Sequence, residues 1–275
     1  MDDRAQETTG YLQGPNGWLY GCFHAAPAPT DCACLTIAPF GEERKCAYRL
    51  IVEVSRALAA RLPVMRFDLS GTGESTGSHA DATLTRWLAD AAVALGQLRQ
   101  SAPEARRFWL LGARLGANLA LRFAATEPAV AGLLLWEPLL TGEDFLNEMI
   151  RRKQIKEMMG GGQASSLADE QQRQWDRGEA VDFDGFPVNA ALANELRNLN
   201  LVKDLGLVGQ RRALLAHVTG AKTLSGPWGE IETSFQGASH RFVIVRQKPF
   251  WGLLDYQESK ELRDETMAFV SPMAG

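Results

Sequence analysis

The stretch Arg107–Ala124, RFWLLGARLGANLALRFA, has the pattern of a buried strand, a glycine turn and a helix. Its first part, Phe108–Leu111, is short, apolar and partly aromatic, which favours a strand. From Leu115 onward the apolar residues recur at helical spacing. The turn between them is Gly-x-Arg-x-Gly, with Arg114 at its centre. The stretch therefore predicts a sharp strand-to-helix corner that displays the Arg114 side chain.

The composition is that of a globular protein. The chain has 275 residues, of which 45% are hydrophobic and 23% charged, enough for one large domain with a full core. A net charge of −4 and a pI near 5.7 give no broad basic field, so we expect no nucleic-acid partner. No apolar run approaches membrane-spanning length, and the N-terminal segment is acidic rather than a signal peptide, so we expect a cytoplasmic location. The oligomeric state does not follow from the sequence.

Two features that resemble cofactor motifs are incomplete. The four cysteines lie in the first fifth of the chain without the paired spacing of a zinc site: Cys22, Cys32, Cys34 and Cys46. The loop Gly71-x-Gly73 lacks the third glycine and the downstream acidic residue of a dinucleotide fingerprint. We therefore expect neither a metal nor a cofactor.

Further apolar runs alternate with helical patterns around the opening stretch. The turn-rich cluster Gly14–Gly17 predicts a hairpin over residues 11–24 at a sheet edge. The other strands are expected at residues 32–38, 63–67, 131–136, 213–219 and 241–245, and the helices at residues 47–61, 83–100 and 257–270. Apolar strands that alternate with helices indicate a mostly parallel sheet with helices on both faces.

Residues 141–205 break this alternation, because they are polar and helical with a Ser/Gln/Asp-rich stretch. We interpret them as an inserted helical cap, with residues 1–140 and 206–275 forming the core. Ligands of open α/β sheets bind outside the carboxyl ends of the strands. The segments expected there are residues 39–43, 68–75 and 113–115, Glu137, and residues 249–251. We expect them to share one pocket, with Phe40 and Trp251 as aromatic wall.

The strand order, the DLSGTGES loop at residues 68–75 and the GARLG corner at residues 112–116 resemble those of the α/β-hydrolases over nearly the whole chain. The corner has the spacing of their nucleophile elbow, Gly-x-Ser-x-Gly. More narrowly, APFGEERKCAYRL, LLLWEPLLTGEDFLNEMIRRK and RQKPFW resemble segments of the exosortase A system-associated hydrolase 2 proteins, which are encoded beside exopolysaccharide and protein-sorting functions. The resemblance implies the α/β-hydrolase fold, whereas activity does not follow from fold alone.

The catalytic triad of that superfamily needs a nucleophile, a histidine base and a carboxylate that orients it. Arg114 stands at the nucleophile position, and a guanidinium cannot attack a carbonyl. The loop expected to hold the histidine contains Lys248–Trp251, and residues 220–223 contain no acid. The resemblance therefore predicts that the usual triad is absent.

Other residues do not visibly rebuild the triad. His240 precedes the last strand, and His217 lies within a strand, where we expect a packed core histidine. His79 lies in a loop near the pocket mouth, where we expect a solvated side chain. The nucleophile types near the pocket lack a visible base: Ser70, Ser75 and Cys46.

A cation at a helix N-terminus is unfavourable unless it meets an anion. One interpretation of Arg114 is an internal ion pair with Glu42, Glu43 or Glu137, because an unpaired buried guanidinium is costly. A second interpretation is a site for a small carboxylate, phosphate or sulfate ligand held by the guanidinium fork. The residues of that binding site would be Arg114, Phe40, Glu43, Glu137 and Trp251.

A third interpretation retains an enzyme, in which Glu42 or Glu43 activates water and Arg114 stabilises the oxyanion of an ester or related acyl substrate. This role requires a raised carboxyl pKa, which a neighbouring arginine opposes. We therefore expect an accessory or non-catalytic protein that binds a small anionic ligand. The sequence leaves open whether the protein turns over a substrate.

Overall fold

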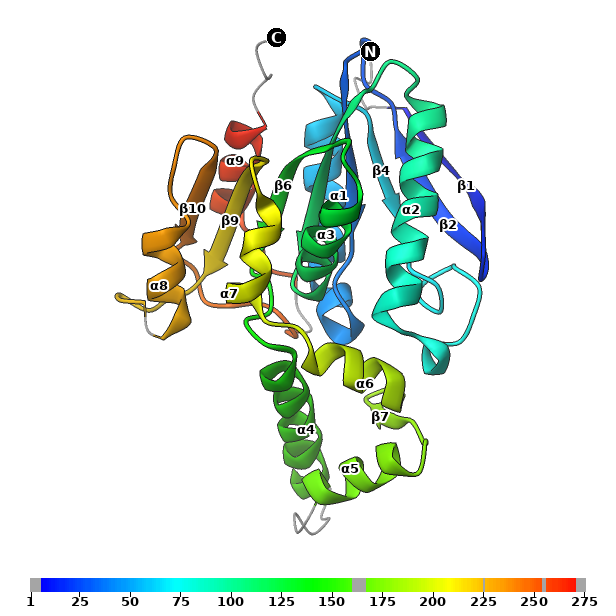
Figure 1. Cartoon of the computed structure of the whole chain (residues 1–275), viewed down its shortest axis with the longest axis vertical. Helices are drawn as coiled ribbons and strands as arrows, with labels where there is room; N and C mark the ends of the chain where they lie inside the picture. The colour runs from blue at the N-terminus through cyan, green and yellow to red at the C-terminus, as the bar shows by residue number, and fades with distance from the viewer. Residues whose placement is uncertain (1–5, 160–166, 225, 254–255, 271–275) are drawn as a thin grey trace.

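The computed structural model describes residues 6–159, 167–224, 226–253 and 256–270, and an eight-stranded sheet forms its centre (Figure 1). The strands of this sheet are β1 (Glu7–Gly14), β2 (Gly17–His24), β3 (Cys32–Ile37), β4 (Val64–Phe67), β5 (Arg107–Ala113), β6 (Val130–Trp136), β9 (Arg212–Val218) and β10 (His240–Val245). Their order is β1-β2-β4-β3-β5-β6-β9-β10. Only the β1–β2 and β2–β4 pairs are antiparallel. The mostly parallel sheet and the edge hairpin were both predicted correctly.

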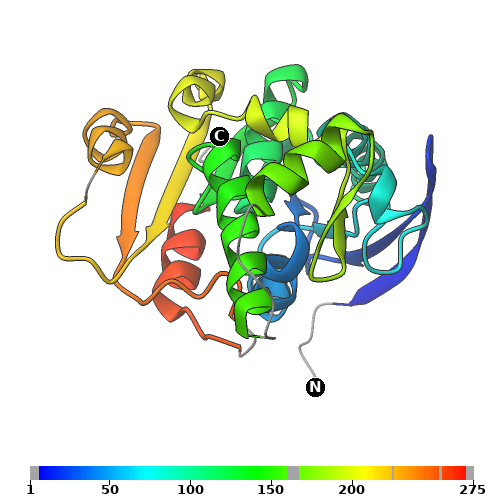
Figure 2. The same ribbon diagram turned by 90° about the horizontal axis from the view of Figure 1, so that it is seen from below.

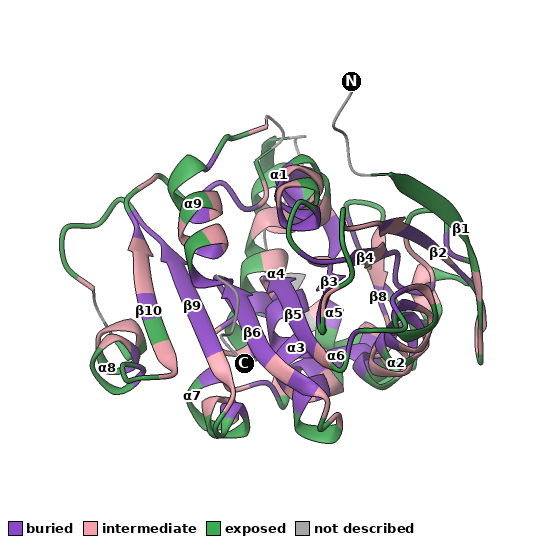
Figure 3. Ribbon diagram, turned by 90° about the horizontal axis from the view of Figure 1, so that it is seen from above, coloured by how far each residue is buried: buried purple, intermediate pink, exposed green. Residues whose placement is uncertain are grey.

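Helices cover both faces of the sheet, as the solid apolar strands indicate. One core lies between the sheet and α1 (Gly41–Ala59) and α9 (Lys260–Phe269). The other lies between the sheet and α2 (Leu84–Ser101) and α3 (Leu115–Thr126). In Figure 3 the central strands are buried along most of their length, with these helix pairs on opposite sides. Every described helix is too short or too polar to cross a bilayer.

Helix α1 begins six residues before the predicted start, at Gly41, which has φ 61°. The sequence analysis expected this helix only over residues 47–61, so its predicted start was wrong. Phe40 is the N-cap residue and offers no side-chain hydrogen bond. Glu42 and Glu43 lie in the first turn, where the helix dipole favours negative charge. This early start places both glutamates at the carboxyl edge of the sheet.

Between β6 and β9 the chain leaves the sheet and forms α4 (Gly142–Met159), α5 (Leu167–Asp176), the hairpin of β7 (Val181–Phe183) and β8 (Phe186–Val188), and α6 (Ala190–Arg197). The described parts of this region, residues 142–159 and 167–197, lie across the edge where the parallel strands end (Figures 1 and 2). The indole of Trp175 donates a hydrogen bond to the carbonyl oxygen of Val188 at 2.8 Å, which ties α5 to the hairpin. The helices of this region were predicted from the sequence, and the hairpin was not.

The chain returns to the sheet through α7 (Leu201–Asp204) and a short 3-10 helix (Leu205–Val208), which pack on α3. A further helix, α8 (Pro227–Ser234), follows β9 and precedes β10 in the chain, and it was not predicted. Its first residue is proline, which is tolerated at a helix start because the missing N–H would have no partner there.

Candidate functional site

The corner between β5 and α3 has the predicted sharp geometry. Arg114 adopts φ 52° and ψ −125°, a backbone conformation that non-glycine residues rarely adopt. The flanking glycines are required by close backbone approach. A Cβ at Gly112 would overlap the carbonyl oxygen of Gly116, and a Cβ at Gly116 would overlap the carbonyl oxygen of Ile37. The corner therefore presents one side chain, Arg114, at the carboxyl edge of the sheet.

Arg114 meets an acidic partner from α1. Its Nε donates to Oε1 of Glu43 at 2.8 Å, and the two side chains are only 13% and 4% exposed. Its Nη1 lies 3.5 Å from the backbone oxygen of Glu137, and its Nη2 lies 3.9 Å from Oε2 of Glu148. Of the three glutamates considered as partners, Glu43 forms the pair.

The carboxyl group of Glu43 is strongly desolvated despite its pairing with Arg114. Burial raises the pKa of its carboxyl group, and the attraction of Arg114 only partly offsets that effect. Its Oε2 atom is buried and has no hydrogen-bond partner among the described residues. The expected opposition of Arg114 to a raised pKa is present but is outweighed by desolvation.

The carboxylate of Glu137 does not pair with Arg114. It accepts hydrogen bonds from Nδ1 of His217, at 2.9 and 3.0 Å, and from the backbone N–H of Val218. The His217 ring is also stacked on Trp228 of α8, with centroids 4.1 Å apart and planes 16° from parallel. His217 is buried, as expected, but the sequence analysis missed its carboxylate partner. The signal was the position of both residues at the ends of apolar runs, because β6 and β9 are neighbours.

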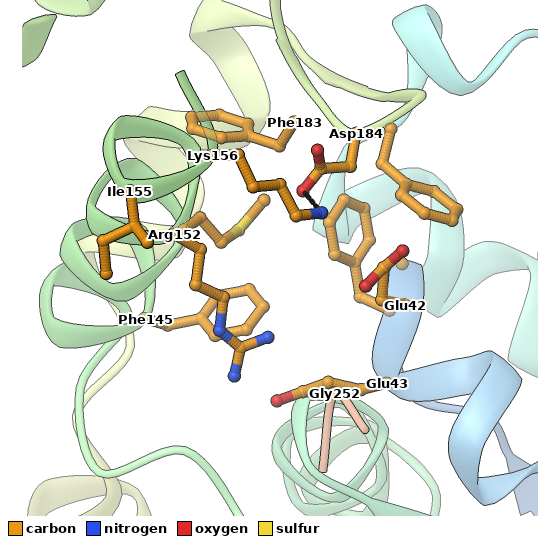
Figure 4. Close-up of a pocket in the computed structure, with 13 residues that line it drawn as sticks. Glu42, Glu43, Phe145, Arg152, Ile155, Lys156, Phe183, Asp184 and Gly252 are labelled. Atoms are coloured by element: carbon orange, nitrogen blue, oxygen red, sulfur yellow. Dashed lines mark ion pairs between the residues drawn. The ribbon is translucent and has the colours of Figure 1, made fainter. Parts of the chain in front are cut away.

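A cavity of about 230 Å³ lies between the first turn of α1, the α4 helix and the β7–β8 hairpin. Its walls carry four phenylalanines: Phe40, Phe145, Phe183 and Phe186. Its charged residues are Glu42, Glu43, Arg152, Lys156 and Asp184 (Figure 4). Of the residues predicted for a shared pocket, Phe40, Glu42 and Glu43 line it. Arg114, Glu137 and Trp251 do not.

The two cations of this cavity come from α4. Arg152 pairs with Glu148, and Nζ of Lys156 lies 2.7 Å from Oδ2 of Asp184 (Figure 4). Their side chains are 38% and 55% exposed. Neither cation was predicted from the sequence, although Phe145, Arg152 and Lys156 are spaced to share one helix face.

The remaining candidates occupy structural positions. Trp251 packs against Phe250 in the core between the sheet and α1, with ring centroids 4.4 Å apart. His79 is not a solvated loop residue: its ring lies 5.0 Å from that of Phe40, and burial lowers its pKa. Ser75 donates to the backbone oxygen of Asp68 at 2.6 Å. The Cys46 thiol donates to the backbone oxygen of Glu42 at 3.2 Å.

One group in the described chain brings three potential metal ligands together: Glu7, Cys22 and His24. Two arginines already contact these groups. Nε of Arg66 lies 2.8 Å from Nε2 of His24, and Arg56 pairs with Glu7. Two guanidinium groups at these donors oppose the binding of a further cation.

Comparisons with known proteins bear on the fold. The family model described as serine aminopeptidase, S33 (Hydrolase_4) matches residues 48–160. A solved putative hydrolase from Agrobacterium vitis S4 aligns with 97% of this chain and 99% of its own, at 15% identity and a TM-score of 0.61. Est1E from Butyrivibrio proteoclasticus, solved with ferulic acid, aligns with 94% of this chain and 96% of its own, at 18% identity and a TM-score of 0.62.

The α/β-hydrolase GrgF from Penicillium sp. sh18 aligns with 96% of this chain and 97% of its own, at 13% identity and a TM-score of 0.65. The chain has the α/β-hydrolase fold. A search of curated proteins finds no match. In α/β-hydrolases the corner between this strand and helix is the nucleophile elbow, so Arg114 stands at the elbow position. The residues matched by the family model include Arg114 and α4 but not Glu43.

Proposed function

We propose that this α/β-hydrolase-fold protein binds a small anionic ligand with an apolar body in the cavity under α4, and that it does so without a Ser-His-Asp triad. The observation that carries the proposal is the convergence of Arg152 and Lys156 on a cavity walled by four phenylalanines. A predominantly apolar pocket with a few charged groups is the usual form of a small-molecule site. The volume of about 230 Å³ favours a small ligand.

The absence of triad chemistry is supported by Arg114 at the elbow position and by the surroundings of His217. Arg114 supplies no nucleophile at neutral pH. The carboxylate of Glu137 accepts a hydrogen bond from His217, but the His217 ring is stacked on Trp228 and does not line the cavity. These positions support an accessory or binding role.

The anion is assigned to Arg152 and Lys156 rather than to Arg114. Arg114 is buried and already neutralised by Glu43, and it does not line the cavity. Arg152 and Lys156 are partly exposed and pair with exposed or half-exposed acids, which a ligand carboxylate or phosphate can replace at little cost. The first turn of α1 lines the same cavity and has no side-chain cap, so its N–H groups also favour an anion.

We further propose that residues 141–205 act as a cap over this site, with residues 1–140 and 206–275 as the α/β-hydrolase core. The walls contributed by α4 and the β7–β8 hairpin support this division. A cap that supplies both the apolar wall and the cations would determine ligand choice independently of the elbow.

Calorimetric titration tests the binding proposal. We expect saturable binding of octanoate and 3-phenylpropionate that weakens with added salt, and no binding of octanol. Arg152→Ala and Lys156→Ala should each weaken octanoate binding about tenfold, because each removes a charge-assisted hydrogen bond. Arg151→Ala is the matched control, since Arg151 is exposed on the same helix and does not line the cavity. Equal affinity in all three variants would contradict the assignment.

The alternative is a hydrolase that acts on an ester or related acyl substrate with Glu43 or Glu42 as general base and Arg114 as oxyanion stabiliser. The raised pKa of Glu43 favours it, because a base poised nearer neutrality accepts a proton more readily. Turnover of short acyl esters and thioesters that disappears in Glu43→Gln, in a variant whose circular dichroism shows that it is folded at the assay temperature, would establish it. Turnover lost only in Glu42→Gln would assign the base to Glu42.

We also propose an association with exosortase or exopolysaccharide systems, on the resemblance of the sequence segments given above. Deleting the gene should alter exopolysaccharide yield or protein sorting in the producing cell. Complementation with wild type, but not with Arg152→Ala, would link that phenotype to the cavity.

A further inference from the structure

Strand β1 lies at one edge of the sheet and is exposed along most of its length (Figure 3). Within the described chain it pairs only with β2, in a continuous antiparallel register from Glu7 opposite His24 to Gly14 opposite Gly17. The backbone groups on its other side form the outer edge of the sheet. Such an edge can bind a further strand through backbone hydrogen bonds.

The register shows which residues of β1 point their backbone groups outward. The backbone oxygen of Gln6 accepts from the N–H of Ala25 at 3.0 Å, so the even-numbered residues that follow it bond to β2. Tyr20, which stands opposite Tyr11, instead accepts from the N–H of Asp68 on the far side of β2. Bonded and non-bonded pairs alternate, so the odd-numbered residues direct N–H and C=O away from β2. These residues are Glu7, Thr9, Tyr11 and Gln13.

Strand β1 lacks the features by which soluble proteins block an exposed edge. Its sequence, ETTGYLQG, contains neither lysine nor proline, and its register with β2 has no bulge. The charge of Glu7 is paired with Arg56. At the opposite edge of the sheet, by contrast, the side-chain amide of Gln236 donates to the backbone oxygen of Phe242 in β10. The outer side of β1 is therefore open to a partner strand.

We propose that β1 pairs with β1 of a second copy of this chain, in an antiparallel ladder with its two-fold axis at Gly10. The sheets of the two copies then form one continuous sheet. In this register Thr9 lies opposite Tyr11 of the second copy, and Glu7 lies opposite Gln13 of the second copy.

The outward row of β1 complements itself, which favours a second copy as the partner. An antiparallel two-fold arrangement sets each outward donor against an acceptor. The register centred on Gly10 engages all four outward residues and places Glu7 against a neutral side chain, whereas a register centred on Glu7 would set like charges opposite each other. It also covers Tyr11, which is 57% exposed, with Thr9 of the second copy, a favourable cross-strand pair.

Analytical ultracentrifugation of the full chain tests the pairing. We expect a species of twice the 30.1 kDa chain mass that accumulates as the concentration rises. Thr9→Pro should weaken dimerisation at least about tenfold, because it removes an outward N–H from both copies and none that bonds to β2. Thr9→Lys keeps that N–H and should also weaken dimerisation, because the two lysines lie close across the axis. Thr9→Val is the matched control and should dimerise within about threefold of wild type.

Mild oxidation of Gly10→Cys by oxidised glutathione tests the register. The two introduced thiols would lie opposite each other at the axis, at a Cα separation that a disulfide spans. A Cβ at Gly10 meets no atom within 4 Å, and the four native cysteines are buried. Thr8→Cys is the control, because residue 8 lies opposite residue 12 of the second copy, which keeps its two thiols several residues apart.

Dimerisation lost in Thr9→Pro and Thr9→Lys, both folded by circular dichroism, with a cross-link in Gly10→Cys but not in Thr8→Cys, would support the proposal. A chain that stays monomeric up to about 1 mM would overturn it. Dimers unaffected by either Thr9 variant would also overturn it, because they would use another surface. A monomer whose Thr9 and Tyr11 amides resist hydrogen exchange would show that another segment of the chain covers this edge, which overturns the proposal as well.

Discussion

Arg114, at the corner between β5 and α3, donates from Nε to Oε1 of Glu43 in the first turn of α1, at 2.8 Å. The pair links the N-terminal ends of two helices whose dipoles both favour negative charge. Glu43 therefore satisfies its own helix and neutralises the cation that stands at the elbow position. This relationship makes Arg114 a structural partner of Glu43, and the proposed function accordingly assigns anion binding to the cations of α4.

Removing one partner of this pair should cost far more than removing both. Arg114→Leu leaves a buried carboxyl group without its counter-ion and should lower the free energy of unfolding by about 3–5 kcal/mol. Glu43→Leu with Arg114→Leu should lie within about 1–2 kcal/mol of wild type, because buried pairs and apolar replacements have similar stability. Equilibrium unfolding in urea measures all three proteins. A single-variant cost no larger than that of the double variant would contradict this account.

The raised pKa of Glu43 predicts a pH dependence of stability with a definite sign. A folded-state pKa above the ordinary value of 4.5 means that the folded protein binds the proton more tightly than the unfolded chain does. The contribution of Glu43 is therefore fully present below pH 4.5 and is lost as the pH rises through the folded pKa. Relative to Glu43→Gln, wild type should lose stability as the pH rises above 4.5. A difference that stays constant or grows over that range would show that the pKa is not raised.

The lowered pKa of His24 predicts a loss of stability as the pH falls, opposite to the effect of Glu43. Burial and the nearby Arg66 guanidinium lower its pKa from 6.5 to about 4. The unfolded chain then binds this proton more tightly, so stability is lost as the pH falls from 6.5 towards 4. The lost stability should reach about 3 kcal/mol relative to His24→Gln, at about 1.36 kcal/mol for each pKa unit. Urea unfolding of both proteins at about pH 7 and about pH 4 measures it, and parallel losses would refute the lowered pKa.

Substitution of glycine by alanine should be harmful only where the added Cβ would overlap neighbouring atoms. Gly116→Ala should prevent folding or strongly destabilise the protein, because its Cβ would overlap backbone oxygen of Ile37 and Ala38. Gly96 lies within α2, and a Cβ added there would have no atom within 4 Å, so Gly96→Ala should add about 0.5–1 kcal/mol. Thermal unfolding distinguishes them, and similar melting temperatures for both variants would contradict the corner geometry.

Much of the fold was predictable because it depends on local pattern. The solid apolar runs that became β3, β5, β6 and β9 are buried on both faces, and that burial produces the continuous hydrophobic pattern. Element ends were less predictable. Helix α1 starts at Gly41 because a left-handed glycine turns the chain directly into the helix, and the polar run after it carries no apolar period.

The site was only partly predictable because its contacts join distant segments. Arg114 and Glu43 are 71 residues apart, and the sequence offered three glutamates of equal standing. Glu137 was not available because the neighbouring strand places His217 against its carboxylate. The cavity cations Arg152 and Lys156 were missed because their role depends on where α4 lies relative to α1, which no spacing in the sequence determines.

The most direct test of the account is a crystal structure of the protein with bound octanoate. We predict the carboxylate beside Arg152 and Lys156, the alkyl chain among the cavity phenylalanines, and an intact Arg114–Glu43 pair. An octanoate carboxylate bound to Arg114, with Glu43 displaced, would contradict the assignment. It would show that the anion binds at the elbow position instead.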